Sequence, residues 1–254
     1  MELPLARAVA ARIEVLPEAG STNAVLRAAA EDASGWPHLS VLLTDNQTAG
    51  RGRLDRTWTA PAGASLAVSV LLRRLPARVD LRGWVPLAAG VAMADAVADQ
   101  LPEHEVVVKW PNDVLVDGRK ICGILAEADA DAVIVGTGVN TAMTSAQLPV
   151  PSATSFAVLG VEVDADRLIS RYLTRLDQLV GALAASDDAL SSGLHAEVVR
   201  RCATIGLAVR VSLPGDRLLD GVAVALDDEG RLVVRADGAV HAVSAGDVVH
   251  VRPS

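Results

Sequence analysis

A β-hairpin signal near the middle of the chain restricts the fold more than any other feature of the sequence. Asp117-Gly118 stands between two short apolar runs, residues 114–116 and 121–125. An Asp-Gly pair readily supplies the two positive φ angles that a two-residue turn requires. A third apolar run, residues 105–110, has the length of a buried strand and precedes the hairpin. The sequence therefore predicts neighbouring strands here, with an antiparallel pairing across the turn.

Helices and further strands surround this hairpin without strict βαβ alternation. Residues 13–16, 39–44, 65–72 and 132–137 have the composition of strands, while residues 81–101 and a segment capped by Asp164 or Asp166 have helical patterns. Such an order favours an α+β fold with a mixed or antiparallel sheet and packed helices. From residue 203 short strands separated by turn residues predict a small SH3-like β-barrel. We therefore expect two domains, residues 1–202 and 203–254.

The composition excludes several classes of function. A net charge of −8 disfavours general binding to nucleic acid. Two cysteines and five scattered histidines provide neither a disulfide framework nor a metal-ligand spacing. The N-terminus lacks a secretory pattern, and the apolar run 85–98 contains Asp95 and is too short to span a bilayer. We expect a cytoplasmic protein that binds no membrane, with that run forming a buried helix.

Lysine is confined to the segment around the hairpin. Lys109 and Lys120 are the only two lysines among 23 basic residues, and the others are arginines. In a chain so rich in arginine, a retained lysine indicates a need for a compact charge on a flexible stem. The alternative is that both lysines are chance survivors in solvated turns, and packing is a second explanation for Lys109.

A glycine- and arginine-rich segment, residues 45–58, follows the strand 39–44. Gly50 and Gly52 allow sharp bends, and Arg51, Arg53 and Arg56 can bind carboxylate or phosphate oxygens in bidentate fashion. The segment is not a P-loop or a dinucleotide fingerprint, because Asp55 occupies the place of a third glycine. It predicts either a basic loop that orders on an anion or a solvated hairpin turn.

Other polar and aromatic residues are candidates for the same site. Ser21 and Thr22 precede a helical segment, where capping alone and ligand contact are both consistent with the position. Trp58 and Trp110 can offer a ring face to a base, although core filling is an equal alternative for Trp110. If the two lysines and the arginines of the loop converge, a phosphate-bearing ligand is expected, with Asp113 available to Mg²⁺.

Five segments together resemble one family in order and spacing. They are Gly20-Ser21-Thr22-Asn23, residues 47–53 with Trp58, Lys109-Trp110-Pro111-Asn112-Asp113, residues 120–125, and Gly136-Thr137-Gly138-Val139-Asn140. In this order they are similar to the biotin–protein ligases, as is the small C-terminal barrel. The resemblance covers nearly the whole chain and implies a catalytic domain of the class II synthetase-like, biotin–lipoate ligase type.

The resemblance implies a reaction in two steps. Biotin and ATP would form biotinyl-5′-AMP with release of pyrophosphate, and a lysine of a biotin carboxyl carrier domain would then displace AMP. The residues that would contact biotin by this likeness are Ser21, Thr22, Asn23, Gln47, Gly50, Arg51, Lys120 and Gly123. Those that would contact the nucleotide are Arg53, Trp58, Asn112, Asp113 and Asn140. Lys120, Arg53 and Lys109 would serve the chemistry, and Asp113 would bind the Mg²⁺ of ATP.

The chain departs from the family pattern in two respects. Asp55 stands where members often have glycine, and the sequence begins close to the catalytic domain, without the helix-turn-helix that some members use as a repressor. With its negative net charge, we expect no operator DNA binding. The family contains monomers and dimers, so a homodimer is among the states that the resemblance allows.

Two other functions compete with this interpretation. A lipoate or octanoyl ligase or transferase shares the fold and transfers an acyl group to lysine, although the arginine-rich loop and the C-terminal barrel favour biotin. A non-catalytic ligand-binding module is the alternative from another class. The lysine pair together with Asp113 disfavours it, because binding alone does not require all three.

Overall fold

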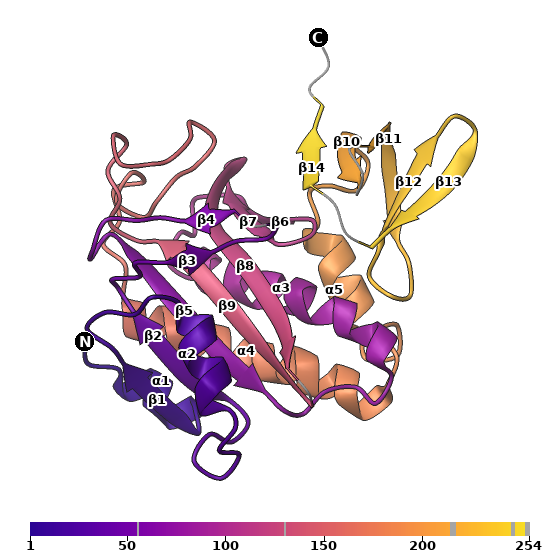
Figure 1. Cartoon of the computed structure of the whole chain (residues 1–254). Coiled ribbons are helices and arrows are strands. Elements are labelled where there is room, and N and C mark those ends of the chain that lie inside the picture. The colour runs from indigo at the N-terminus through magenta and orange to yellow at the C-terminus, as the bar shows by residue number, and fades with distance from the viewer. Residues whose placement is uncertain (55, 130, 214–216, 245–246, 252–254) are drawn as a thin grey trace.

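The computed structural model describes residues 1–54, 56–129, 131–213, 217–244 and 247–251. Its largest element is a seven-stranded sheet in the order β1-β2-β5-β9-β8-β7-β6 (Figure 1). Only β1 and β2 pair in parallel, so the sheet is mixed, as expected from the sequence. The strands are β1 Arg12–Val15, β2 Ser40–Thr44, β5 Ser65–Leu72, β6 Val106–Lys109, β7 Asp113–Val116, β8 Arg119–Asp129 and β9 Ala132–Asn140.

Helices cover the two faces of this sheet unequally. The back face bears α1 (Pro4–Val9), α3 (Trp84–Ala98), α4 (Ala165–Ser186) and α5 (Leu194–Arg201), and together with the sheet they enclose the main core (Figure 1). The front face bears the short α2 (Thr22–Ala29), whose Leu26 packs on Leu42, Leu71 and Ile134 in a second, smaller core. Much of the front face therefore remains available for a pocket.

The apolar run expected to be a buried helix is confirmed as α3. Most of Val79–Ala98 is buried inside the fold, although by length and composition alone the segment could cross a membrane. The charge of Asp95, its only acidic residue within the α-helix, is paired with Arg175 of α4 at 3.1 Å and with Arg201 of α5. A buried apolar helix with a compensated charge is what a core position requires.

Two predicted boundaries differ from the observed ones. The helix expected over 81–101 begins as a 3₁₀ turn, Val79–Gly83, before α3 itself, and it ends at Ala98. The strand expected over 132–137 extends to Asn140, because residues 133–140 of β9 pair with β5 and residues 132–139 pair with β8. Pairing on both sides favours the extended backbone even through Gly136 and Gly138, whose intrinsic strand preference is low.

The hairpin turn at Asp117-Gly118 is confirmed. The two residues have φ angles of 49° and 75° and connect β7 to β8. The expected N-cap of α2 is also present, since Ser21 Oγ accepts a hydrogen bond from the Ala24 amide at 3.4 Å. Asp164, rather than Asp166, caps α4 through the Arg167 amide. Local sequence signals thus determined these element ends.

A second, antiparallel sheet forms the C-terminal part of the chain, in the order β13-β12-β11-β10-β14. Its strands are β10 Ala208–Leu213, β11 Arg217–Leu226, β12 Leu232–Ala236, β13 Ala239–Val243 and β14 Asp247–His250. The expected domain boundary after residue 202 falls between α5 and β10. The small C-terminal unit agrees with the sequence-based fold class.

Two tryptophans attach this second sheet to the first. The indole N–H of Trp84 donates to the Asp228 carbonyl at 2.8 Å, and that of Trp110 donates to the Gly230 carbonyl at 3.1 Å. Both acceptors belong to the turn between β11 and β12. Trp110 is buried at this junction and does not line the pocket described below, so the structure favours the core-filling alternative for its ring.

The junction has a titratable group in His250. Burial, reinforced by the charge of Lys109, lowers the pKa of His250 below its ordinary value of 6.5. The unfolded chain therefore binds this proton more readily than the folded protein does. The stabilising effect of neutral His250 is complete above pH 6.5 and is lost as the pH falls from 6.5 towards the lowered value.

Replacement of His250 by glutamine should flatten this part of the pH profile. We expect the urea midpoint of the wild type to fall between pH about 6.5 and about 5 more steeply than that of His250→Gln. His241→Gln is the matched control, because His241 is exposed on β13. Equal slopes for the wild type and His250→Gln would contradict the role given to this side chain.

Candidate functional site

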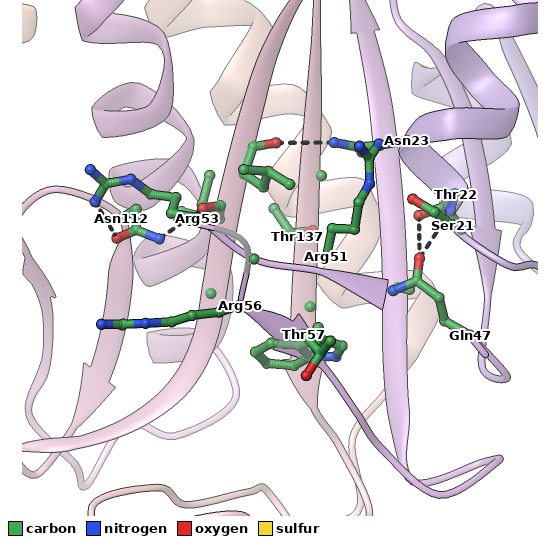
Figure 2. A pocket seen from close by; sticks show the side chains of 18 of the residues that line it. Ser21, Thr22, Asn23, Gln47, Arg51, Arg53, Arg56, Thr57, Asn112 and Thr137 are labelled. Atoms are coloured by element: carbon green, nitrogen blue, oxygen red, sulfur yellow. Dashed lines mark hydrogen bonds between the residues drawn. The ribbon is translucent and has the colours of Figure 1, made fainter. Parts of the chain in front are cut away.

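A pocket opens on the front face of the large sheet, where three central strands present small side chains. On β5 the core face bears Leu66, Val68 and Val70, while the pocket face bears Ala67 and Ser69. The pocket is bounded by the N-terminus of α2, by the described residues of the segment that joins β3 (Gly50–Arg51) to β4 (Thr57–Trp58), and by strands β7, β8 and β9 (Figure 2). Its lining includes Ser21, Thr22, Asn23, Gln47, Arg51, Arg53, Arg56, Trp58, Asn112, Asp113, Lys120, Gly123, Gly136 and Gly138.

Glycines on β8 and β9 make room for the indole of Trp58. Gly123 and Gly138 are paired directly across the two strands. A Cβ added at Gly138 would lie 2.5 Å from the Trp58 ring, and one added at Gly123 would lie 3.2 Å from it. The ring consequently packs against a part of the sheet that bears no side chains and provides an apolar wall.

A β-bulge turns Lys120 into the pocket. In the β7–β8 pair, Val114 is opposite Cys122 but Leu115 is opposite Lys120, so Ile121 is an extra residue on β8. Ile121 and Cys122 are consequently both buried in the core, and Lys120 lies on the same face as Gly123. Strict alternation would have placed Lys120 on the core face.

The main chain of Lys120 is fixed by the loop that follows β9. Its N–H donates to the Ser152 carbonyl at 2.8 Å, and its carbonyl accepts from the Thr154 N–H at 2.8 Å. The displaced backbone groups thus retain partners, and the lysine stem starts from a rigid point. Asn140 holds the same loop, because its buried amide donates to the Thr154 carbonyl at 2.9 Å.

Paired charges and amides occupy one end of the pocket. Lys120 Nζ lies 2.6 Å from Asp113 Oδ1, and both side chains are mostly shielded from solvent. Next to them, Asn112 accepts a hydrogen bond from Arg53 at 3.2 Å and donates to the Ile124 carbonyl at 2.9 Å (Figure 2). Asn112 therefore connects the arginine of the loop to the main chain of β8.

Neutral polar groups occupy the other end. Gln47 Oε1 accepts from the Thr22 N–H at 2.9 Å and from the Thr22 hydroxyl at 3.1 Å (Figure 2). Ser69 Oγ lies 2.8 Å from Thr22 Oγ1 and 2.6 Å from Asn23 Oδ1. Capping and pocket lining therefore coexist at Ser21 and Thr22, as the helix N-terminus permits.

A carboxylate at the rim of the pocket holds two arginines. Glu127 Oε1 lies 2.8 Å from Arg27 and 3.3 Å from Arg51, and Oε2 accepts from Asn23 at 2.7 Å. Burial raises the pKa of Glu127, but the Asn23 hydrogen bond and the two guanidinium charges outweigh it and lower the pKa overall. Glu127 is therefore ionised at neutral pH.

The structure brings most of the predicted site residues together, with a few exceptions. Lys109 is paired with Asp113 across β6 and β7 and so shares its sheet face, but it lies outside the pocket lining. The Asn140 amide donates to the Thr154 carbonyl of the loop after β9, and Gly50 packs closely against Gln47 and Trp58. Asp55 lies outside the described residues. The roles assigned to these residues stay predictions.

Sequence reasoning missed two participants, Ser69 and Glu127. Ser69 is one of the small residues on β5. The only sequence signal that it faces the pocket was its position between two valines of this strand. Glu127 follows Gly123 and Leu125 at two-residue spacing on β8, which places all three on the pocket face. Neither residue belongs to a motif that the sequence analysis used.

The arrangement can bind an elongated anion with an uncharged polar head. Donors and acceptors at the Thr22–Gln47 end suit a neutral polar ring, while Lys120 and Arg53 at the opposite end suit carboxylate or phosphate oxygens. Among the described residues, no group of three or more His, Cys, Asp or Glu side chains could hold a metal ion.

Comparison with known proteins gives matches over nearly the whole chain. Residues 20–140 match the model of the Biotin/lipoate A/B protein ligase family, and residues 204–251 match that of the Biotin protein ligase C terminal domain. The chain is 41% identical over 244 residues to a biotin–[acetyl-CoA-carboxylase] ligase of Mycobacterium tuberculosis, covering 95% of this chain and 90% of the relative.

Solved structures give the same result for the fold. A biotin protein ligase from Aquifex aeolicus in complex with biotin and ATP aligns with a TM-score of 0.77 at 23% identity, covering 96% of this chain and all of that one. One from Leishmania major in complex with biotinyl-5-AMP aligns with a TM-score of 0.65 at 28% identity, covering 92% and 99% of the two chains.

A pair of alanine substitutions tests whether the loop depends on its close backbone approach. A Cβ at Gly50 would lie 2.5 Å from both Gln47 Nε2 and the Trp58 carbonyl, whereas the nearest atom to a Cβ at Gly52 is 3.4 Å away. We expect Gly50→Ala to open the β3–β4 pair and expose the Trp58 indole. Acrylamide quenching of tryptophan fluorescence should increase in Gly50→Ala and stay near the wild-type value in Gly52→Ala. Equal quenching in the two variants would contradict this role of Gly50.

Proposed function

The chain belongs to the biotin/lipoate A/B protein ligase family, and we propose the following account of its reaction from the geometry of its pocket. The protein is an ATP-dependent ligase that attaches biotin to a lysine of a carboxylase carrier domain. One observation supports this most directly: a single pocket gathers a neutral polar end, an apolar wall and a lysine–aspartate pair from segments far apart in the chain.

Biotin fits this pocket in one orientation. Its ureido ring would lie against Thr22 and Gln47, where donors and acceptors alternate, and its apolar chain would pass along Trp58. The carboxylate would then reach Lys120, the lysine that lines the pocket. Shape and polarity thus select an acid with a polar head and an apolar stem.

In the first step a biotin carboxylate oxygen attacks the α-phosphorus of ATP. The new O–P bond forms as the bond to the pyrophosphate oxygen breaks, giving biotinyl-5′-AMP and pyrophosphate. Negative charge moves from the carboxylate towards the phosphate during this step. Lys120 can follow that charge on its flexible stem, whereas a planar guanidinium would favour one geometry.

Asp113 serves this lysine as a positioning partner. The 2.6 Å contact keeps the ammonium within the pocket until a substrate anion competes for it. Arg53, oriented by Asn112, would neutralise the phosphate from the side of the loop. Catalysis of this kind consists mainly of positioning and charge neutralisation.

In the second step the uncharged ε-amine of the carrier lysine attacks the carbonyl carbon of biotinyl-5′-AMP. An amide bond forms, the bond to the phosphate oxygen breaks, AMP leaves, and the amine releases a proton. The mixed anhydride must be shielded from water until the carrier arrives. Arg51, Arg53 and Trp58, which line the pocket from the described parts of this segment (residues 50–54 and 56–58), are placed to provide that shield (Figure 2).

We propose that Mg²⁺ enters with ATP as part of the substrate. One carboxylate, Asp113, and one amide oxygen, of Asn112, are close enough to the pocket to be considered as ligands. Mg²⁺ commonly keeps several waters and binds through one or two carboxylates plus phosphate oxygens, so this donor set fits a nucleotide-borne ion. The ion would shield the charge of the phosphates.

Pyrophosphate release distinguishes the proposed function from its rivals. With ATP and Mg²⁺, we expect the purified protein to release pyrophosphate with biotin and not with lipoate, and to label a carrier domain with biotin. Pyrophosphate release with lipoate but not with biotin would favour a lipoate ligase. If neither acid causes pyrophosphate release, the protein is a binding module. Incubation without ATP is the control.

Replacement of Lys120 by arginine should abolish adenylation while the fold is retained. The charge persists in this variant, but the guanidinium cannot follow the moving charge. We expect less than about a tenth of the wild-type rate of biotin-dependent pyrophosphate release. Arg119→Lys is the matched control, because it makes the reverse exchange at the exposed neighbouring position. A Lys120→Arg rate above that level would contradict the role of Lys120.

A further inference from the structure

A carboxylate outside the pocket lining controls one of its arginines. Glu127 lies at the rim, on the same face of β8 as Gly123, and contacts Arg51, which lines the pocket. We propose that Glu127 is a positioning residue for Arg51, holding its guanidinium at the pocket before biotin or the adenylate binds. This inference rests on the proposed function and adds to it a residue that never touches the substrate.

Glu127 is itself firmly anchored on the side away from the pocket. Asn23 donates to it at 2.7 Å and Arg27 lies at 2.8 Å, both from α2. Only 17% of its side chain is exposed. A carboxylate fixed by two contacts on one helix presents its remaining charge in a defined direction.

Arg51 is held more loosely by the same carboxylate. Its guanidinium lies 3.3 Å and 3.4 Å from the two Glu127 oxygens, and 46% of its side chain is exposed. The ion pair with Glu127 therefore limits the positions of the Arg51 guanidinium but still lets it move towards a ligand. One carboxylate between two guanidinium groups also leaves one positive charge uncompensated, which remains available to an incoming anion.

The carboxylate also terminates a chain of polar contacts that begins at the neutral polar end of the pocket. The chain runs from Gln47 through Thr22, Ser69 and Asn23 to Glu127. The neutral polar end of the pocket is thus connected by side chains to the carboxylate at the rim, so that end and the position of Arg51 depend on one another. Preorganisation of this kind lowers the ordering cost of binding.

Glu127→Gln tests the proposal, because the amide preserves size and one acceptor but removes the charge. We expect the biotin Kd, measured by calorimetry without ATP, to rise about tenfold, with kcat for pyrophosphate release within about twofold of the wild type. Arg27→Gln is the matched control: it removes the other cation from Glu127 and leaves Arg51 paired. Asn23 still anchors Glu127 in this variant, so its biotin Kd should rise clearly less than that of Glu127→Gln.

A double-mutant cycle separates positioning from a general effect on the fold. If Glu127 acts through Arg51, then Glu127→Gln added to Arg51→Ala should not weaken biotin binding further. Additive effects of the two substitutions, or an unchanged Kd in Glu127→Gln, would overturn the proposal. Thermal unfolding of each variant shows whether a change in Kd merely reflects lost stability.

Hydrogen exchange tests the same restraint without any ligand. In the free protein, amides of residues 50–54 should exchange faster in Glu127→Gln than in the wild type or Arg27→Gln. Unchanged exchange would overturn the proposal even for an active enzyme. Conversely, faster exchange in a protein that fails to release pyrophosphate with biotin would support the restraint while refuting the proposed function.

Discussion

The pairing of β8 with β9 is the constraint on which the site depends, because these strands must serve two environments at once. One face supplies Ile124, Val135 and Val139 to the core, and the other supplies glycines to a pocket. Strand alternation alone satisfies this division along most of β8. It fails at Lys120, and the extra residue Ile121 corrects it.

The bulge shows how a local irregularity provides a functional residue. An uninterrupted β8 would bury the lysine in the core, where an unpaired ammonium is costly. Shifting one residue exchanges a buried charge for a buried isoleucine and places the ammonium beside Asp113. The departure from regular pairing therefore serves stability and the site together, as is common for bulges near active sites.

The sequence predicted those features that depend on neighbouring residues. The Asp117-Gly118 turn, the cap at Ser21, a helix cap at Asp164 or Asp166, the buried helix α3 and the mixed sheet all followed from the order of the elements and from local patterns. Motif resemblance, rather than pattern, identified the members of the pocket. What could not be predicted depends on register and distant contacts: the bulge at Ile121, the burial of Trp110 at the junction, and the participation of Ser69 and Glu127.

The contact between the C-terminal sheet and the rest of the fold depends less on side-chain identity than the pocket does. Trp84 and Trp110 both donate to main-chain carbonyls of one turn, at Asp228 and Gly230. Main-chain acceptors are present whatever side chains the turn bears, so the docking is specified by backbone shape and by two indoles, one at the start of α3 and one just after β6. We therefore expect the side chains of Asp228 and Glu229 to be replaceable as long as the turn keeps its conformation, whereas Gly230, with a φ angle of 80°, and the two tryptophans are not.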